Sequence, residues 1–131
     1  MKFIRALACF ALAVLASNNA KGASIGLFST SDCSSCNLTI PPGETRTAYI
    51  KVLAGSLEWT GAEFRVIGLP DGWTATSTPN PARGFVLGDP FGNRANIGFN
   101  ETQTGDCTLL YTVQITATSA ESGVVLLVAA G

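Results

Sequence analysis

The chain has 131 residues, of which 47% are hydrophobic and 13% are charged, and its formal net charge is −1 at pH 7. This length supports one domain, because domains usually hold roughly 100–200 residues. The chain contains no histidine, which excludes Ser-His-Asp and Cys-His catalysis and removes the commonest zinc and copper ligand. We therefore expect no metal and no cofactor.

Residues 1–23 have the layout of a secretory signal peptide. A short basic start at residues 1–5 precedes an unbroken apolar run over residues 6–16. Such a run is typical of the apolar region of a signal peptide and is too short to span a bilayer as a helix. Cleavage could follow Ala16, Ala20 or Ala23, and we favour Ala23, which leaves a mature domain of residues 24–131 that is secreted or periplasmic.

Removing residues 1–23 also removes Lys2, Arg5 and Lys21, which leaves 5 basic and 9 acidic residues and a net charge of −4. Nucleic-acid binding relies on lysine and arginine at the phosphates, so we expect no nucleic-acid partner. We also expect no membrane contact once the signal peptide has been removed.

The rest of the chain alternates short runs of Val, Ile, Thr, Phe and Tyr with clusters of turn-forming residues. Strands are predicted at residues 24–29, 46–53, 62–67, 73–77, 85–87, 95–99, 107–118 and 124–130. The Ser/Cys/Asn-rich stretch between the first two runs is predicted as a loop, and Pro79, Pro81 and Pro90 limit residues 85–87 to a short edge strand. This order predicts an all-β antiparallel sandwich of jelly-roll, cohesin-like or Ig-like type, with a closed barrel as the rival.

Alternation within the runs predicts which side chains face the core. Ala48, Ile50 and Val52 share one face of the second run, and Ala62, Phe64 and Val66 share one face of the third. The best-buried side chains are expected to include Phe64, Trp73, Leu109, Tyr111, Val113 and Ile115. The final run is apolar on both faces and ends almost at Gly131, so truncation of a longer parent protein stays an alternative.

Cysteine use points to an exported protein. Cys9 should leave with the signal peptide, so the mature chain keeps Cys33, Cys36 and Cys107. A thioredoxin-like use of the Cys33–Cys36 spacing needs a helix that residues 37–42 do not favour, and a zinc site lacks its fourth ligand. We predict a structural disulfide from this loop to Cys107, with Cys36 favoured over Cys33 and one thiol left spare; a local bond between Cys33 and Cys36 is the alternative.

Four aromatic residues are candidates for stacking on a ligand ring. Trp59 stands in a loop or at a strand start, where it can be exposed, and Trp73 follows a turn, where core packing is the stronger interpretation. Tyr49 and Phe91 are the other contributors to such a surface. The carboxylates show no distinctive spacing for the acid pair that a glycosidase needs.

Several motifs carry a resemblance: Gly61-Ala62-Glu63-Phe64-Arg65 through Gly68-Leu69-Pro70-Asp71-Gly72-Trp73, then Thr78-Pro79-Asn80-Pro81 and Leu87-Gly88-Asp89-Pro90. With the strand at 107–118, this order resembles a group of uncharacterised exported bacterial proteins across about residues 24–130. More distantly it looks like cohesin-type sandwiches, which are related in fold to cellulose-binding modules. That resemblance implies a nine-stranded jelly roll that docks partner proteins without catalysis. Members of the bacterial group tend to continue further, which implies a truncated chain.

The sequence supports three hypotheses for function. The first is a non-catalytic interaction or structural module of the cell exterior that presents one sheet face to an extracellular or periplasmic protein. The second is a carbohydrate-binding module for a polysaccharide, which needs aromatic rings in line on a solvent face. The third is a small secreted hydrolase, which the missing histidine makes the weakest.

Overall fold

The structure is a computed structural model that describes residues 4–7, 14–15, 23–119 and 126–129 of the chain. Every regular element within these residues is a β-strand, and none of them forms a helix that could cross a bilayer. The strands are β1 (Ile4–Leu7), β2 (Val14–Leu15), β3 (Ser24–Phe28), β4 (Asn37–Ile40), β5 (Thr45–Leu53), β6 (Trp59–Ile67), β7 (Thr74–Pro79), β8 (Phe85–Gly88), β9 (Ala95–Gln103), β10 (Asp106–Thr116) and β11 (Leu126–Ala129).

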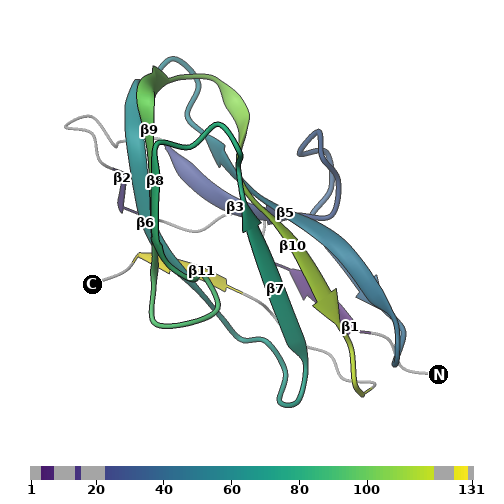
Figure 1. Cartoon of the computed structure of the whole chain (residues 1–131). Coiled ribbons are helices and arrows are strands. Elements are labelled where there is room, and N and C mark those ends of the chain that lie inside the picture. The colour runs from purple at the N-terminus through teal and green to yellow at the C-terminus, as the bar shows by residue number, and fades with distance from the viewer. Residues whose placement is uncertain (1–3, 8–13, 16–22, 120–125, 130–131) are drawn as a thin grey trace.

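Two antiparallel sheets pack together as a sandwich, so the predicted fold class is confirmed. The first sheet has the order β3-β5-β10-β7, and the second has the order β11-β6-β9-β8, with β2 also paired to β6. Figure 1 shows β5, β7 and β10 in one layer and β6, β8 and β9 in the other. The strands are divided between two sheets, so the rival prediction of a closed barrel is wrong.

The predicted signal peptide overlaps parts of the chain that lie outside the described residues, namely 1–3, 8–13 and 16–22. Of the described parts, β1 pairs with β4 and β2 pairs with β6. Cleavage of this segment therefore stays a prediction. The last predicted strand is present as β11, which pairs with β6, but the burial of its side chains also lies outside what is described.

One core fills the space between the sheets. The buried faces alternate as the sequence predicts: Ala48, Ile50 and Val52 from β5 meet Ala62, Phe64 and Val66 from β6. The rings of Phe64 and Tyr111 join the two sheets directly, edge to face, with centroids 5.8 Å apart. Offset and edge-to-face ring pairs of this kind add stability beyond the buried area.

The predicted facing of β10 is right for Tyr111, Val113 and Ile115, which are buried, but wrong for Leu109. Leu110 is fully buried instead, and Leu109 is only half-buried. The pairing of β10 with β5 shifts register between Leu109 and Tyr111. An extra residue at such a bulge breaks strict alternation, so two successive side chains can face the core.

β4 is a strand that the sequence does not predict, because residues 37–40 follow a Ser/Cys-rich stretch that favours a loop. Its burial alternates, with Leu38 and Ile40 in the core and Asn37 and Thr39 exposed. The run is only four residues long and is stopped by Pro41-Pro42, so its alternation is too short to stand out. β8, by contrast, is the short edge strand that the prolines predicted.

Candidate functional site

The two tryptophans proposed as stacking residues are buried. The Trp59 ring packs edge to face on Phe99 with centroids 5.6 Å apart. Trp73 packs into the same core cluster, and its indole nitrogen donates to the Ser119 hydroxyl at 3.2 Å. Neither ring is presented to a ligand, because both fill space between the sheets. The alternative that they face a ligand is therefore wrong for both, and the predicted burial of Trp73 is confirmed.

Tyr49 and Phe91 do not complete an aromatic platform either. Tyr49 is half-buried on β5, and the Lys51 ammonium lies 5.8 Å from its ring centroid. Phe91 belongs to the loop between β8 and β9 and packs partly against the core. The four predicted residues therefore do not form one surface.

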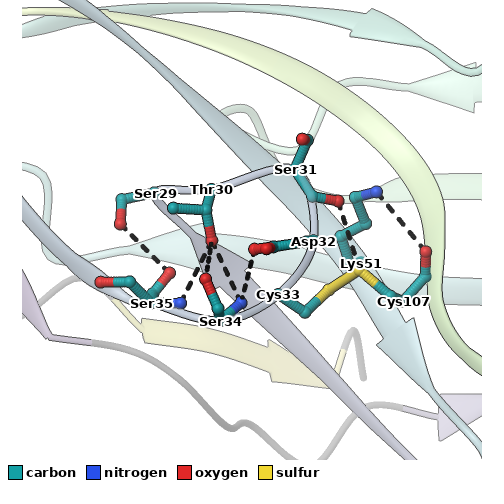
Figure 2. Close-up of a disulfide and its surroundings, with 9 residues drawn as sticks. All are labelled: Ser29, Thr30, Ser31, Asp32, Cys33, Ser34, Ser35, Lys51 and Cys107. Carbon is teal, nitrogen blue, oxygen red and sulfur yellow. Dashed lines mark hydrogen bonds between the residues drawn. A yellow bond between two sulfur atoms is a disulfide. The ribbon is translucent and has the colours of Figure 1, made fainter.

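The outer face of the first sheet is tied to a loop by a disulfide. Cys33 is bonded to Cys107, and their Cα atoms are 5.8 Å apart (Figure 2). The long-range bond is confirmed, but the preference for Cys36 is wrong. The Ser29 amide donates to the Ser35 carbonyl at 2.8 Å and closes the neck of the loop, so Cys33 lies inside the loop and Cys36 lies beyond it.

The prediction of one spare thiol is also wrong. Cys36 is disulfide-bonded, and no described cysteine is free. A local bond between Cys33 and Cys36 is excluded because Cys33 pairs with Cys107. Both Cys33 and Cys107 have positive φ, 63° and 69°, a backbone region that residues other than glycine rarely adopt. At Cys107 this coincides with a second register shift in β10.

Two side chains on this outer face are buried outside the core. Phe28 alternates with the core residues Ile25 and Leu27 on β3, and only 3% of it is exposed. Lys51 is 8% exposed, and its ammonium donates to the Cys107 carbonyl at 3.4 Å (Figure 2). Burial lowers the pKa of Lys51, while the charge of Asp32 in the loop acts in the opposite direction. The covered face therefore carries an apolar ring and a desolvated cation.

Among the described residues, no disulfide-tied loop covers the outer face of the second sheet. The side chains that alternate with its core residues are Glu63, Arg65 and Ile67 on β6, Asn96 on β9, and Phe85 and Leu87 on β8. Pairing aligns Glu63 with Asn96 and Asn96 with Leu87, so these three side chains form one row across the sheet. Among the described residues, Phe85 is 51% exposed and Leu87 is 65% exposed, and Ile67 is the remaining exposed large hydrophobic residue.

The Phe85 ring lies against the backbone of Gly98, its pairing partner on β9. A Cβ added at position 98 would overlap three ring atoms, Cε1, Cζ and Cδ1. Only glycine leaves the sheet surface open enough for a ring to rest there. Half of this side chain nevertheless remains exposed, so part of it faces solvent.

A hollow of about 410 Å³ lies further along β8, at Leu87, and its lining residues are Glu63, Leu87, Gly88, Asn93, Arg94 and Asn96. The Asn96 side-chain nitrogen donates to Glu63 Oε1 at 2.7 Å. Arg94 Nη1 is 4.0 Å from Glu63 Oε2, which makes an ion pair without a close hydrogen bond. The hollow therefore holds one carboxylate, one guanidinium and two amides above an apolar edge.

The loop after β8 holds Arg94 and Asn93 at this hollow. Gly88 has a φ of 75°, and a Cβ there would clash with the Arg94 carbonyl oxygen, so only glycine fits. The loop is closed by Asp89, whose amide donates to the Arg94 carbonyl at 3.0 Å and whose carboxylate accepts from the Phe91 amide at 2.8 Å. These contacts give the hollow a fixed wall.

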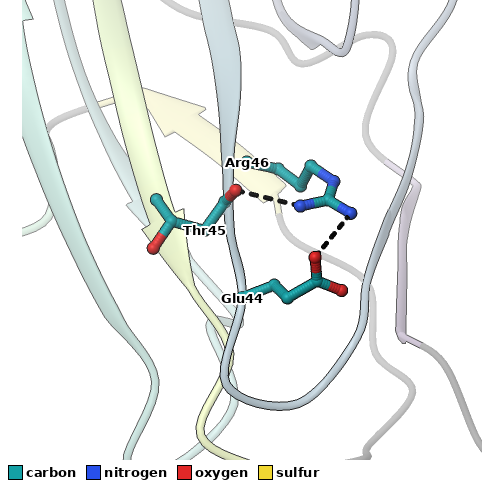
Figure 3. Close-up of polar contacts among 3 residues, drawn as sticks. All are labelled: Glu44, Thr45 and Arg46. Atoms are coloured by element: carbon teal, nitrogen blue, oxygen red, sulfur yellow. Dashed lines mark hydrogen bonds and ion pairs between the residues drawn. The ribbon is translucent and has the colours of Figure 1, made fainter.

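A second ion pair among the described residues lies away from the hollow, at the start of β5. Arg46 donates to the Glu44 carboxylate at 3.2 Å and to the Thr45 carbonyl at 3.1 Å (Figure 3). Both charged side chains are more than 40% exposed. Exposed pairs of this kind contribute little to stability, so this contact marks a strand end and not a site.

The described residues contain no group of three or more His, Cys, Asp or Glu side chains that could hold a metal ion. Glu63 is the one acidic residue among those that line the hollow. Hydrolysis of a glycosidic bond generally uses a pair of carboxyl groups. The hollow therefore offers hydrogen bonding and shape, without that pair.

Comparison with known proteins adds no relative, because no family model, curated protein or solved structure matches the chain. The outward residues of β8 were missed by the sequence analysis. A signal for them existed: once residues 85–87 are taken as an edge strand with Val86 inward, alternation places Phe85 and Leu87 outward. Nothing in the sequence showed that Glu63 and Asn96 would stand beside them, because strand pairing fixes that row.

Proposed function

We propose that the chain is a non-catalytic interaction module of the cell exterior that engages its partner through the outer face of β6, β8 and β9. The observation that carries this proposal is the exposure of Phe85 and Leu87, side by side on β8. The opposite outer face keeps Phe28 and Lys51 buried. Clustered exposed apolar side chains mark interaction sites more often than scattered ones.

Export is supported by the Cys33–Cys107 disulfide, since such bonds form and persist in oxidising compartments. The signal-like residues 1–23 support the same compartment. A secreted or periplasmic location is therefore part of the proposal.

Both partner classes expected from the sequence, a protein and a polysaccharide, would use this same face. A hydrolase is the weakest candidate, because the hollow supplies a single carboxylate. The mixed character of the face, one ring beside hydrogen-bonding groups, favours the polysaccharide.

A pair of edge-strand variants tests the proposal. Leu87→Arg places a charge on the open face, and Thr76→Arg places the same charge on an exposed position of β7, the edge of the other sheet. We expect Leu87→Arg to lower the fraction of protein that sediments with isolated cell-envelope material at least tenfold, and Thr76→Arg to leave it unchanged. Equal binding by wild type and Leu87→Arg would overturn the proposal.

A further inference from the structure

Phe85 has the arrangement of a ring prepared for stacking. It rests on Gly98, where a side chain of any other residue would displace it, and half of it stays exposed. An aromatic face attracts partners that present polarised C–H groups or cations, and it needs little conformational ordering when the ring is already supported. The ring is thus held by the sheet from one side and accessible from another.

Hydrogen-bonding groups of the neighbouring strands lie in the next row across the sheet, the row that contains Leu87. Leu87 follows Phe85 by two residues, which is about 7 Å along a strand, and it lines the hollow with Glu63 and Asn96. A carboxylate can accept several hydrogen bonds, and Glu63 uses one on Asn96. The Arg94 guanidinium supplies five N–H donors at the other wall.

These features together fit a sugar better than a protein surface. A pyranose unit has an apolar C–H face for a ring and a rim of hydroxyl groups that both donate and accept. Neighbouring hydroxyls can donate to Glu63 and accept from Arg94, and hydrogen bonds with a charged partner are the strong ones. A volume of about 410 Å³ is within the range of small-ligand pockets.

A protein partner would require a larger apolar centre. Stable protein interfaces bury about 800 Å² on each side around an apolar core. Here Ile67 is separated from Phe85 and Leu87 by the charged side chains of Glu63 and Arg65, so the exposed apolar residues do not form one patch.

We propose that Phe85 and the hollow of Glu63, Arg94 and Asn96 form a binding site for a neutral saccharide chain of two or more pyranose units. One unit stacks on Phe85, and the next enters the hollow. Neutral sugars are favoured because the two charged residues that line the hollow, Glu63 and Arg94, balance each other. This inference rests on the proposed function, since it names the partner of the same face.

The test is isothermal titration calorimetry of the purified protein with four neutral hexasaccharides, built from glucose, xylose, mannose or N-acetylglucosamine, and with hexagalacturonate as an anionic comparison. We expect at least one neutral hexasaccharide to bind, and Phe85→Ala and Glu63→Gln each to weaken binding at least tenfold. Tyr49→Leu, which removes a ring from the covered face, should leave the affinity unchanged.

Gly98→Ala provides a second, geometric readout. The added methyl group displaces the end of the Phe85 side chain and keeps every hydrogen-bonding residue. We expect a loss of affinity similar to that of Phe85→Ala, with an unchanged circular dichroism spectrum. If Phe85 mattered only for folding, Gly98→Ala would not reproduce the loss of affinity that Phe85→Ala causes.

The outcomes separate the inference from the proposed function. Absence of neutral-sugar binding, or binding that these variants leave unchanged, overturns the saccharide site, as does a preference for hexagalacturonate. If Leu87→Arg still abolishes binding to envelope material in that case, the proposed function stands with a protein partner. If Leu87→Arg has no effect either, both fail.

Discussion

The two outer faces of the sandwich differ in how far their phenylalanine rings, Phe28 and Phe85, are exposed. On the first sheet, a loop tied by Cys33–Cys107 accompanies a buried Phe28 and a buried Lys51. On the second sheet, Phe85 and Leu87 remain exposed beside a polar hollow. A sandwich needs only its inner faces to be apolar, so apolar side chains that cluster on an outer face mark a candidate interaction surface. On the first sheet Phe28 is buried and Tyr49 is half-buried, whereas Phe85 on the second sheet stays accessible.

Removing the disulfide should have the largest effect. The bond closes a loop with a sequence separation of 74 residues, and the chain-entropy model gives about 4 kcal/mol for a loop of that size. We expect Cys33→Ala with Cys107→Ala to lower the free energy of unfolding by about that amount in urea titrations. Ser34→Ala, an exposed change in the same loop, should stay within about 0.5 kcal/mol.

Replacing the same two cysteines with glycine separates the effect of losing the disulfide from the effect of backbone strain on stability. Because both cysteines have positive φ, Cys33→Gly with Cys107→Gly relieves strain and should destabilise less than the alanine pair. If both pairs unfold at the same urea concentration as wild type, the loop is not held by this bond.

Truncating Phe28 and truncating Phe85 should lower the free energy of unfolding by unequal amounts. Phe28→Ala removes a buried ring, and such deletions cost about 3–5 kcal/mol because they leave a cavity. Phe85→Ala removes a half-exposed ring and should cost less than about 1 kcal/mol, since little buried area is lost. Similar costs for the two variants, measured by urea unfolding, would contradict the distinction between a covered and an open face.

A smaller effect on the free energy of unfolding should appear at alkaline pH, and it comes from Tyr111 in the core between the two sheets. Burial, and secondarily the charge of Asp89, raises the pKa of Tyr111 from its ordinary value near 10 to about 12. The unfolded chain then loses this proton before the folded chain does. Stability from this group is complete below pH 10 and is lost as the pH rises towards 12, by about 2–3 kcal/mol in total.

Tyr111→Phe isolates this contribution. The buried hydroxyl has no hydrogen-bond partner among the described residues, so the variant should be about as stable as wild type at pH 8. The difference between the two proteins should change with pH only above about 10. A difference that is constant from pH 8 to 11.5 would mean that the Tyr111 hydroxyl is not desolvated.

The sequence predicts which side chains face the core wherever burial alternates from one residue to the next. Strands β5 and β6 were placed with the correct inward faces because Ala48, Ile50 and Val52, and likewise Ala62, Phe64 and Val66, repeat every second residue. The rule failed at Leu109, since a bulge inserts one residue and nothing in the local sequence indicates it.

The candidate site was less predictable because it depends on pairing between strands. The choice of Cys33 over Cys36 follows from the neck between Ser29 and Ser35, which is a property of the folded loop. The hollow arises from register, which sets Glu63, Asn96 and Leu87 in one row although they come from three strands. Trp59 and Trp73 were attractive candidates by residue type, but large apolar rings are also what a core of this size requires.

The most direct measurement of the central claim is amide chemical-shift mapping by NMR, with the ¹⁵N-labelled protein titrated with soluble cell-envelope polysaccharide. We expect the largest shift changes at Phe85, Leu87, Asn96 and Gly98, with little change at Tyr49, Lys51 and Thr112 on the opposite sheet. Changes concentrated on Tyr49, Lys51 and Thr112 instead would contradict the claim that the open face of β6, β8 and β9 is the binding face.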